Sequence, residues 1–186
     1  TSLGWTHDTS TPSTSDTNGI AESAVKRVKE GTSCVLSQSG FLHQWWPDAM
    51  PTYCFHRNVL DVLENGHTAY FNRFGCDFDG PIIPMGAEIR YIPITDVDKA
   101  RCHQFGPKRL TGIFIGHVQN AGGGWSGDLK FVDSEELHNA THANKVNVKE
   151  QNHAEIEVVT TTDNNGKIVY HFPLKDAEQN QPGQTA

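Results

Sequence analysis

The sequence predicts an α+β protein in which helices come first, a small antiparallel β-barrel-like domain follows and a disordered tail ends the chain. Three observations predict this order. Apolar residues recur with a helical period between residues 20 and 63. Short β-like runs separated by Pro and Gly then extend from Cys76, and a polar, acidic sequence follows. We therefore divide the chain into residues 1–75, 76–137 and 138–186.

The first predicted helix spans about residues 20–39, after a Ser/Thr/Pro-rich loop. Pro12 in that loop disfavours helix for the residue before it, and Asn18 and Gly19 allow the chain to turn into the helix axis. The repeat of apolar positions at i, i+3, i+4 and i+7 indicates one buried helix face. This face comprises Ala21, Ala24, Val25, Val28, Thr32, Val35 and Leu36.

A polar stripe follows the flank of the same helix. Glu22, Lys26, Lys29 and Ser33 recur at i, i+4, i+7 and i+11, so one carboxylate and two ammonium groups share an exposed edge. The helix dipole favours an ionised carboxylate in the first turn by about 0.3–1 kcal/mol. Such a carboxylate suits a hard divalent cation, and the lysines suit a phosphate backbone. Glu22 and Lys26 also have the spacing of an ordinary surface ion pair, worth about 0.2–0.5 kcal/mol, and both interpretations stay open.

The second helix is predicted over residues 41–63, with Pro47 near its first turn. Pro51 removes a hydrogen bond one turn further on, which predicts a kink or a late helix start. Residues 68–74 are predicted to form a short helix or turn that ends at Gly75. The predicted buried side of the second helix comprises Trp45, Trp46, Ala49, Met50, Tyr53, Cys54, Val59, Leu60 and Leu63.

The remaining elements are short. Three β-like runs with turns between them are typical of a small antiparallel sheet or barrel, and they cover residues 87–92, 110–118 and 129–132. The glycines of residues 121–125 predict a hairpin tip and not a phosphate loop, because no Gly-Lys-Ser/Thr follows. In the tail, residues 163–166 predict the turn of a hairpin within 156–172. Residues 173–186 are predicted to be disordered.

The charge distribution limits nucleic-acid binding. The net charge is −7, which is the wrong sign for a nucleic-acid binder taken as a whole. Residues 1–127 carry ten basic and twelve acidic groups, whereas residues 128–186 carry five and ten. We therefore expect weak, salt-sensitive DNA binding. Two basic clusters remain for it: Lys26, Arg27 and Lys29, and Lys99, Arg101, Lys108 and Arg109.

Other classes of site find little support in the sequence. Apolar runs are too short to span a membrane and the first twenty residues lack a signal-peptide pattern, so we expect an intracellular protein without a membrane partner. The four cysteines are spaced too widely for a zinc knuckle, which predicts reduced thiols. The ten histidines, with His138 and His142 at helical spacing, supply no set of four zinc ligands.

Residues 9–22, TSTPSTSDTNGIAE, resemble a segment of the integrase catalytic cores of copia-type retrotransposons and their retroviral relatives. The resemblance continues through Lys26 and Lys29 and covers residues 1 to about 137. Later landmarks follow in the same order as in that family: residues 36–40, 45–49, 53–58, 68–70, 74–75 and 112–116.

The resemblance implies a function in DNA integration. Residues 1–75 would be the C-terminal portion of a ribonuclease-H-like core within a Pol polyprotein, and a Src-homology-3-like domain would follow. Glu22 would be the last acid of an Asp-Asp-Glu triad, both catalytic residue and metal ligand, that holds two Mg²⁺ ions during strand transfer into target DNA. The complete enzyme would be nuclear and homo-oligomeric. The implied DNA-binding residues are Lys26, Lys29, Arg27, Asn18 and Gly19.

One departure from the family pattern limits this expectation. Only 21 residues precede Glu22, fewer than separate the last two acids in the family, and Asp8 and Asp16 lie too close to replace the middle acid. The chain therefore supplies one of three metal ligands, and we expect it to be inactive alone. The alternatives are a non-catalytic β-domain interaction module and a transposon relic.

Overall fold

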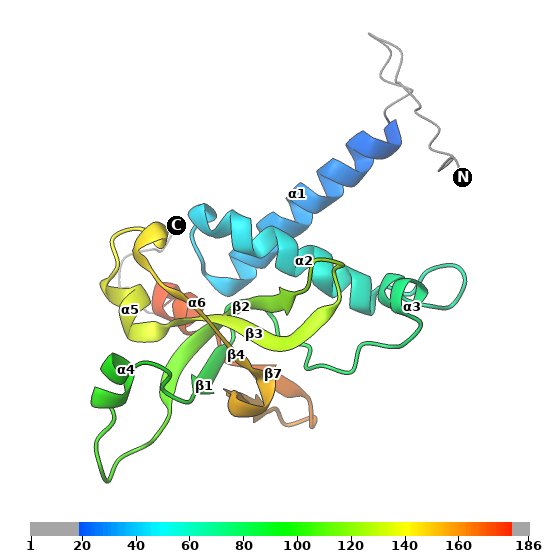
Figure 1. The fold of residues 1–186 in the computed structure, drawn as a ribbon. Coiled ribbons are helices and arrows are strands. Elements are labelled where there is room, and N and C mark those ends of the chain that lie inside the picture. Colours follow the sequence, from blue (N-terminus) through cyan, green and yellow to red (C-terminus); the bar gives the residue numbers. More distant parts are fainter. Residues whose placement is uncertain (1–18, 180–186) are drawn as a thin grey trace.

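The computed structural model describes residues 19–179 and shows a mixed α+β fold with an antiparallel sheet, as predicted (Figure 1). Asn18, the loop before it and residues 180–186 lie outside the described residues. The helices are α1 (Gly19–Ser39), η2 (His43–Trp45), α2 (Trp46–Leu60), α3 (Ala69–Phe74), α4 (Asp96–Ala100), α5 (Ser134–Asn139), η3 (Ala143–Lys145), η4 (His153–Glu155) and α6 (Pro173–Gln179). The strands are β1 (Glu88–Tyr91), β2 (Leu110–Gln119), β3 (Trp125–Asp133), β4 (Val148–Asn152), β5 (Glu157–Val158), β6 (Thr160–Thr162) and β7 (Ile168–Tyr170).

Helix α1 is buried only in its second half. Thr32 is the first buried residue along it, and Gly31 lets the Tyr53 ring lie against the helix, because a Cβ there would lie 2.0 Å from a ring carbon. Towards the start of the helix, Ile20 is 90% and Val25 is 53% exposed. The predicted burial is therefore wrong for its first positions, Ala21, Ala24 and Val25, all of which are exposed since no described element covers them.

Helix α2 begins at Trp46, after the 3-10 turn η2, and ends at Leu60, so it is shorter at both ends than the predicted 41–63; a late start was one of the two outcomes predicted from Pro51. Pro47 lies in its first turn and Pro51 remains inside it. The prediction of its buried side is partly wrong, since Trp46, Met50, Leu60 and Leu63 are exposed. Phe55, which the periodicity missed, is only 2% exposed.

The five-stranded sheet has the order β4-β3-β2-β1-β5, and all its pairs are antiparallel. It is open, so the described residues contain no closed barrel, and the barrel-like arrangement predicted for residues 76–137 is not confirmed. Helix α2 contacts β2 at Thr52, whose hydroxyl donates a hydrogen bond to the carbonyl of Ile115 at 2.6 Å. Gly116 permits this contact, because a Cβ there would lie 2.5 Å from the same hydroxyl.

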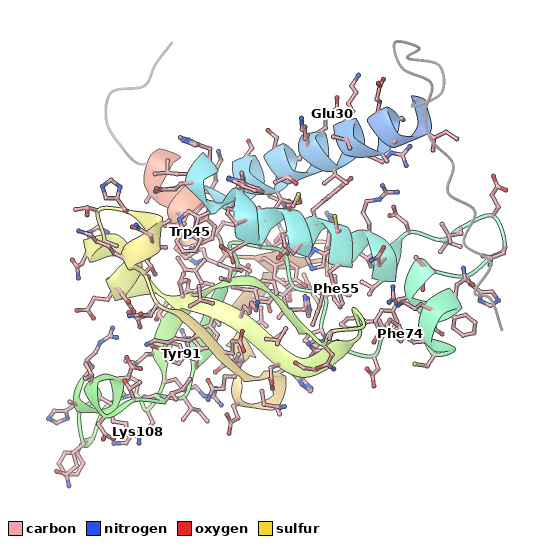
Figure 2. All side chains as sticks on the ribbon, turned by 45° about the horizontal axis from the view of Figure 1, so that its top comes forward. Glu30, Trp45, Phe55, Phe74, Tyr91 and Lys108 are labelled. Atoms are coloured by element: carbon pink, nitrogen blue, oxygen red, sulfur yellow. The ribbon has the colours of Figure 1, made fainter. Side chains whose placement is uncertain are left out.

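Two apolar clusters cover the two faces of the sheet. Alternate residues of β2 enter them: Ile113 and Ile115 belong to the cluster under the helices, and Phe114 belongs to the other. Figure 2 shows Trp45 and Phe55 projecting from the helical layer towards the sheet. The first cluster also contains Phe41, Trp45, Ala49, Met85, Val132 and Val146, and the second contains Ile83, Ala87, Ile89, Tyr91, Leu129 and Phe131.

The residues after 138 are more ordered than predicted. Strand β4 extends the sheet beside β3, and β6 and β7 form the predicted hairpin. The prediction of disorder is wrong for residues 173–179, because they form α6. The reason is that Leu174 packs against the first apolar cluster and His171 bridges the carboxylates of Glu88 and Asp176.

Candidate functional site

Glu22 lies on the first turn of the exposed half of α1. Its side chain lies beside an open cavity of about 660 Å³. The described residues that line this cavity all belong to α1. Among residues 19–179 Glu22 has no ion pair, because Lys26 pairs instead with Glu30 one turn further on, at 3.9 Å. The Glu22–Lys26 pair left open by the spacing is therefore not formed.

The predicted DNA contacts surround this carboxylate. Lys26, Arg27 and Lys29 are exposed on α1, and Lys26 and Lys29 line the same cavity as Glu22. Gly19 is the first residue of the helix, with open space where a Cβ would lie. Asn18 is not among the described residues. The structure thus places two carboxylates, Glu22 and Glu30, and three cationic groups on the solvent-exposed half of α1.

The described residues do not by themselves fit a magnesium site. Within residues 19–179 no group of three His, Cys, Asp or Glu side chains could hold a metal ion. One exposed carboxylate holds Mg²⁺ only weakly, because water must fill the rest of the octahedral shell.

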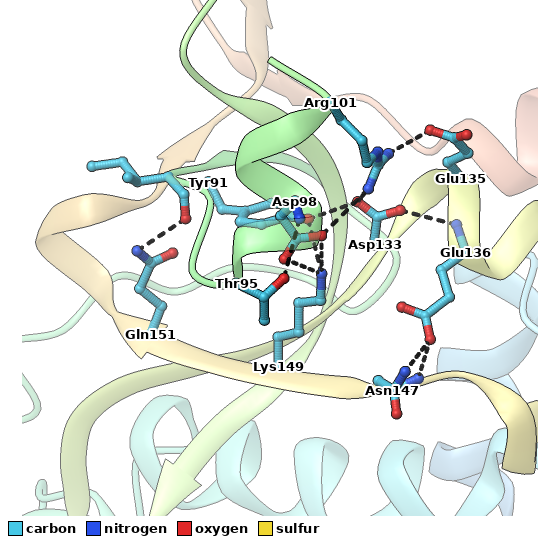
Figure 3. Close-up of polar contacts among 11 residues, drawn as sticks. Tyr91, Thr95, Asp98, Arg101, Asp133, Glu135, Glu136, Asn147, Lys149 and Gln151 are labelled. Carbon is cyan, nitrogen blue, oxygen red and sulfur yellow. Dashed lines mark hydrogen bonds and ion pairs between the residues drawn. The ribbon is translucent and has the colours of Figure 1, made fainter.

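A separate charged cluster lies where β3 meets α4 and α5, and the sequence did not predict it (Figure 3). At its centre is Asp133, a fully buried residue whose Oδ2 accepts hydrogen bonds from the Tyr91 hydroxyl at 2.6 Å and from Arg101 at 2.9 Å. The Oδ1 of Asp133 accepts the backbone N–H of Glu136 at 2.9 Å and so caps α5. Arg101 also binds Glu135 at 2.5 Å.

Asp98 is the second buried carboxylate of this cluster. Lys149 donates hydrogen bonds to both carboxylate oxygens of Asp98, at 2.8 and 2.9 Å. Lys149 also donates to the Tyr91 hydroxyl at 3.2 Å, and Tyr91 in turn binds Asp133, so the two buried carboxylates belong to one network. Arg101 lies 3.5 Å from Asp98. The network therefore ties α4, α5, β1, β3 and β4 together.

Proton affinities in the network follow from burial and pairing. Burial acts to raise the pKa of Asp133, but hydrogen bonds from Tyr91 and Arg101 outweigh it and lower the pKa below 3.8. Burial also acts to raise the pKa of Asp98, but the hydrogen bonds from Lys149 outweigh it, so the pKa of Asp98 is lowered as well. For Tyr91, burial and then the Asp133 carboxylate raise the pKa, so the phenol keeps its proton. Both buried carboxylates are thus ionised and bound by internal donors, which indicates a structural network and not an acid–base pair.

Two histidines meet between the helices and the sheet. The buried His117 ring of β2 stacks on Phe55 with centroids 4.7 Å apart, and its Nε2 donates to the Pro81 carbonyl at 2.8 Å. His56 of α2 lies 5.5 Å from it, centroid to centroid. His117 Nδ1 and His56 Nε2 are buried without a hydrogen-bond partner.

The environment of these rings favours their neutral forms. Burial, followed by repulsion from His117, lowers the pKa of His56 to about 4. Burial lowers the pKa of His117, although its bond to Pro81 acts in the opposite direction. Sequence reasoning missed the pair because sixty residues separate them and no metal-ligand spacing joins them.

Comparisons with family models, curated proteins and solved structures find no match to this chain. None of the helices in the described part of the chain is long and apolar enough to cross a membrane.

Proposed function

We propose that this chain is part of a copia-type retrotransposon integrase, comprising the C-terminal portion of its ribonuclease-H-like core and a small β domain related to the Src-homology-3 type. The complete enzyme would join element DNA to target DNA in the nucleus. Glu22 would be its third catalytic acid and a Mg²⁺ ligand, and Lys26, Arg27 and Lys29 would contact DNA. The ordered series of sequence landmarks supports this assignment.

The exposed half of α1 is the structural observation that carries the proposal. The apolar stripe that is buried at Thr32 and half-buried at Val35 and Leu36 continues, on the same face, to Val25 and Ala21, which are exposed. Exposed apolar surface of this kind marks a place where further polypeptide packs. Glu22 lies beside that stripe, so the polypeptide that covers the stripe would lie next to the carboxylate.

The other two acids of the proposed triad would come from that polypeptide. An enzyme of this class needs all three carboxylates, since two Mg²⁺ ions bound by oxygen ligands stabilise the attacking and the leaving oxygen of the phosphoryl transfer. The chain described here is therefore expected to bind DNA weakly and to join none.

The first test is to sequence the source transcript upstream of Thr1 and express the longer reading frame. We expect two in-frame Asp residues and Mg²⁺-dependent strand transfer that Glu22→Gln lowers by at least about 100-fold, as for loss of an essential catalytic group. Unrelated upstream sequence, or strand transfer that survives Glu22→Gln, would exclude the proposal.

Matched variants on α1 separate a role in chemistry from a role in DNA binding. Glu30→Gln removes the other exposed carboxylate of the same helix half, the ion-pair partner of Lys26, and should not lower strand transfer. Lys29→Gln should weaken DNA binding and reduce the salt dependence by about one counterion. Equal loss of activity in the Glu22 and Glu30 variants would show that the effect is not specific to Glu22.

A further inference from the structure

The turn between β6 and β7 presents an Asn-Gly dipeptide to solvent. Asp163 begins this turn: its amide donates to the Lys167 carbonyl, and its carbonyl accepts the Gly166 amide, both at 3.0 Å. Gly166 has φ of 79°, and Asn165 before it is exposed. The Asn165 side chain has no hydrogen-bond partner among residues 19–179, so it can rotate about its Cα–Cβ bond.

A second turn, which follows α2, has the same backbone arrangement. The Leu63 amide donates to the His67 carbonyl and the Gly66 amide donates to the Leu63 carbonyl, both at 2.9 Å, and Gly66 has φ of 80°. Asn65 is exposed as well, but its side chain is bound at both ends. Its Oδ1 accepts the His67 amide at 3.1 Å, and its Nδ2 donates to Oδ1 of Asn72 at 3.0 Å. The two turns therefore differ in whether the asparagine side chain is held.

This difference matters because an Asn-Gly dipeptide can lose the asparagine amide without an enzyme. Glycine has no side chain to shield its backbone nitrogen. After hydroxide removes the proton from that nitrogen, it attacks the side-chain carbonyl carbon of the asparagine; a new C–N bond forms, the bond to the amide NH₂ breaks and ammonia leaves. Water then opens the cyclic imide at either carbonyl carbon, which gives aspartate or isoaspartate. The attack requires the side chain to turn towards the glycine nitrogen, so hydrogen bonds that hold the side chain slow the reaction.

We propose that Asn165 is a site of spontaneous deamidation in the folded protein, and that Asn65 is protected by its two hydrogen bonds. The isoaspartate product lengthens the backbone by a methylene between residue 165 and Gly166, and it adds a carboxylate near Asp163. Asp163 accepts the amides of Gly166 and Lys167, at 3.0 and 2.9 Å, and both bonds span the lengthened segment. The β6–β7 hairpin therefore loosens after the reaction. The inference does not depend on the integrase proposal.

Peptide mapping by mass spectrometry measures both sites in one sample of the full chain, incubated at mildly alkaline pH. The same mapping in urea gives the rate that each site has without the fold. Relative to its rate in urea, Asn165 should react about tenfold or more faster than Asn65, since two hydrogen bonds must break before Asn65 can react. Equal relative rates, or a folded protein in which Asn165 does not react, would overturn the proposal.

Asn72→Ala is the matched variant, because it removes the acceptor of the Asn65 amide from an exposed position of α3. It should raise the rate at Asn65 about threefold or more and leave the rate at Asn165 unchanged. Circular dichroism establishes that the variant is folded. An unchanged rate at Asn65 would show that hydrogen bonding does not protect it.

The consequence for the hairpin is tested on the deamidated protein, which its added charge separates from the parent by ion exchange. Backbone amides of β6 and β7 should exchange with deuterium faster in this fraction than in the unreacted protein, as expected for a locally loosened element. Equal exchange in the two fractions overturns the proposed loosening.

Discussion

Acidification should loosen the contact between α2 and β2 through His56. The ring is largely buried and its pKa is lowered to about 4, whereas an unfolded chain has the ordinary value near 6.5. The unfolded state therefore binds more protons between these two values, so stability rises with pH in this window and is lost as the pH falls. At 1.36 kcal/mol for each tenfold difference in affinity, this loss reaches about 3 kcal/mol below pH 4.

The buried carboxylates affect stability at lower pH than the histidines do. Asp98 and Asp133 have pKa values lowered below 3.8, so the stability that they contribute is present above that value and is lost only as the pH falls through their folded-state pKa. His117, whose pKa is also lowered, adds to the loss in the His56 window. A decrease in stability between pH 6.5 and 4 therefore reports mainly the two histidines.

Urea denaturation followed by circular dichroism at several pH values between 7 and 4 measures this effect. His56→Leu removes the titrating ring and the unpartnered Nε2 together, so it should flatten the pH dependence of the free energy of unfolding by up to about 1.36 kcal/mol per pH unit. His138→Gln, at an exposed position, is the control and should leave the profile unchanged. The reasoning is refuted if His56→Leu and the parent protein lose stability in parallel down to pH 4.

Three further changes have defined outcomes. Lys149→Met removes the cation that binds both oxygens of the buried Asp98, leaving only Arg101 at 3.5 Å, and should lower the free energy of unfolding by about 3 kcal/mol in urea denaturation, with partial recovery in the Asp98→Asn double variant. Gly86→Ala should lower the Tm by several degrees, because φ is 90° and a Cβ would lie 2.7 Å from the Cα of Ser39. Glu22→Gln should change the free energy of unfolding by less than about 0.5 kcal/mol, since the side chain is exposed and unpaired among the described residues.

The sequence predicted what depends on neighbouring residues. The limits of α1 follow from its period and from Gly40, which closes the helix with φ of 76°. The hairpin of β6 and β7 follows from its turn, in which Asp163 accepts the amides of Asn165 and Lys167. Such signals lie within a few residues of each other, so a single sequence contains them.

Contacts between distant residues could not be predicted in this way. Asp133 stands before Ser134, Glu135 and Glu136, which is a recognisable helix start, but nothing local indicates that Tyr91 and Arg101 would bind it. The same limit explains the error at α6. Its sequence is polar and short, and it folds because Leu174 reaches an apolar cluster built from residues far away in the chain.

The two halves of α1 have different consequences for the site. The second half is fixed, because Thr32 is buried and the Tyr53 ring lies against Gly31. The first half extends from this anchor as one continuous helix, so the position of Glu22 relative to the sheet is set by contacts at Val28 and beyond, at least six residues away. A change at Gly31 should therefore displace the carboxylate without touching it. In the proposed integrase such a change would reduce strand transfer while leaving Glu22, Lys26 and Lys29 in place on their helix, since precise placement of a catalytic group depends on the rigid element that carries it.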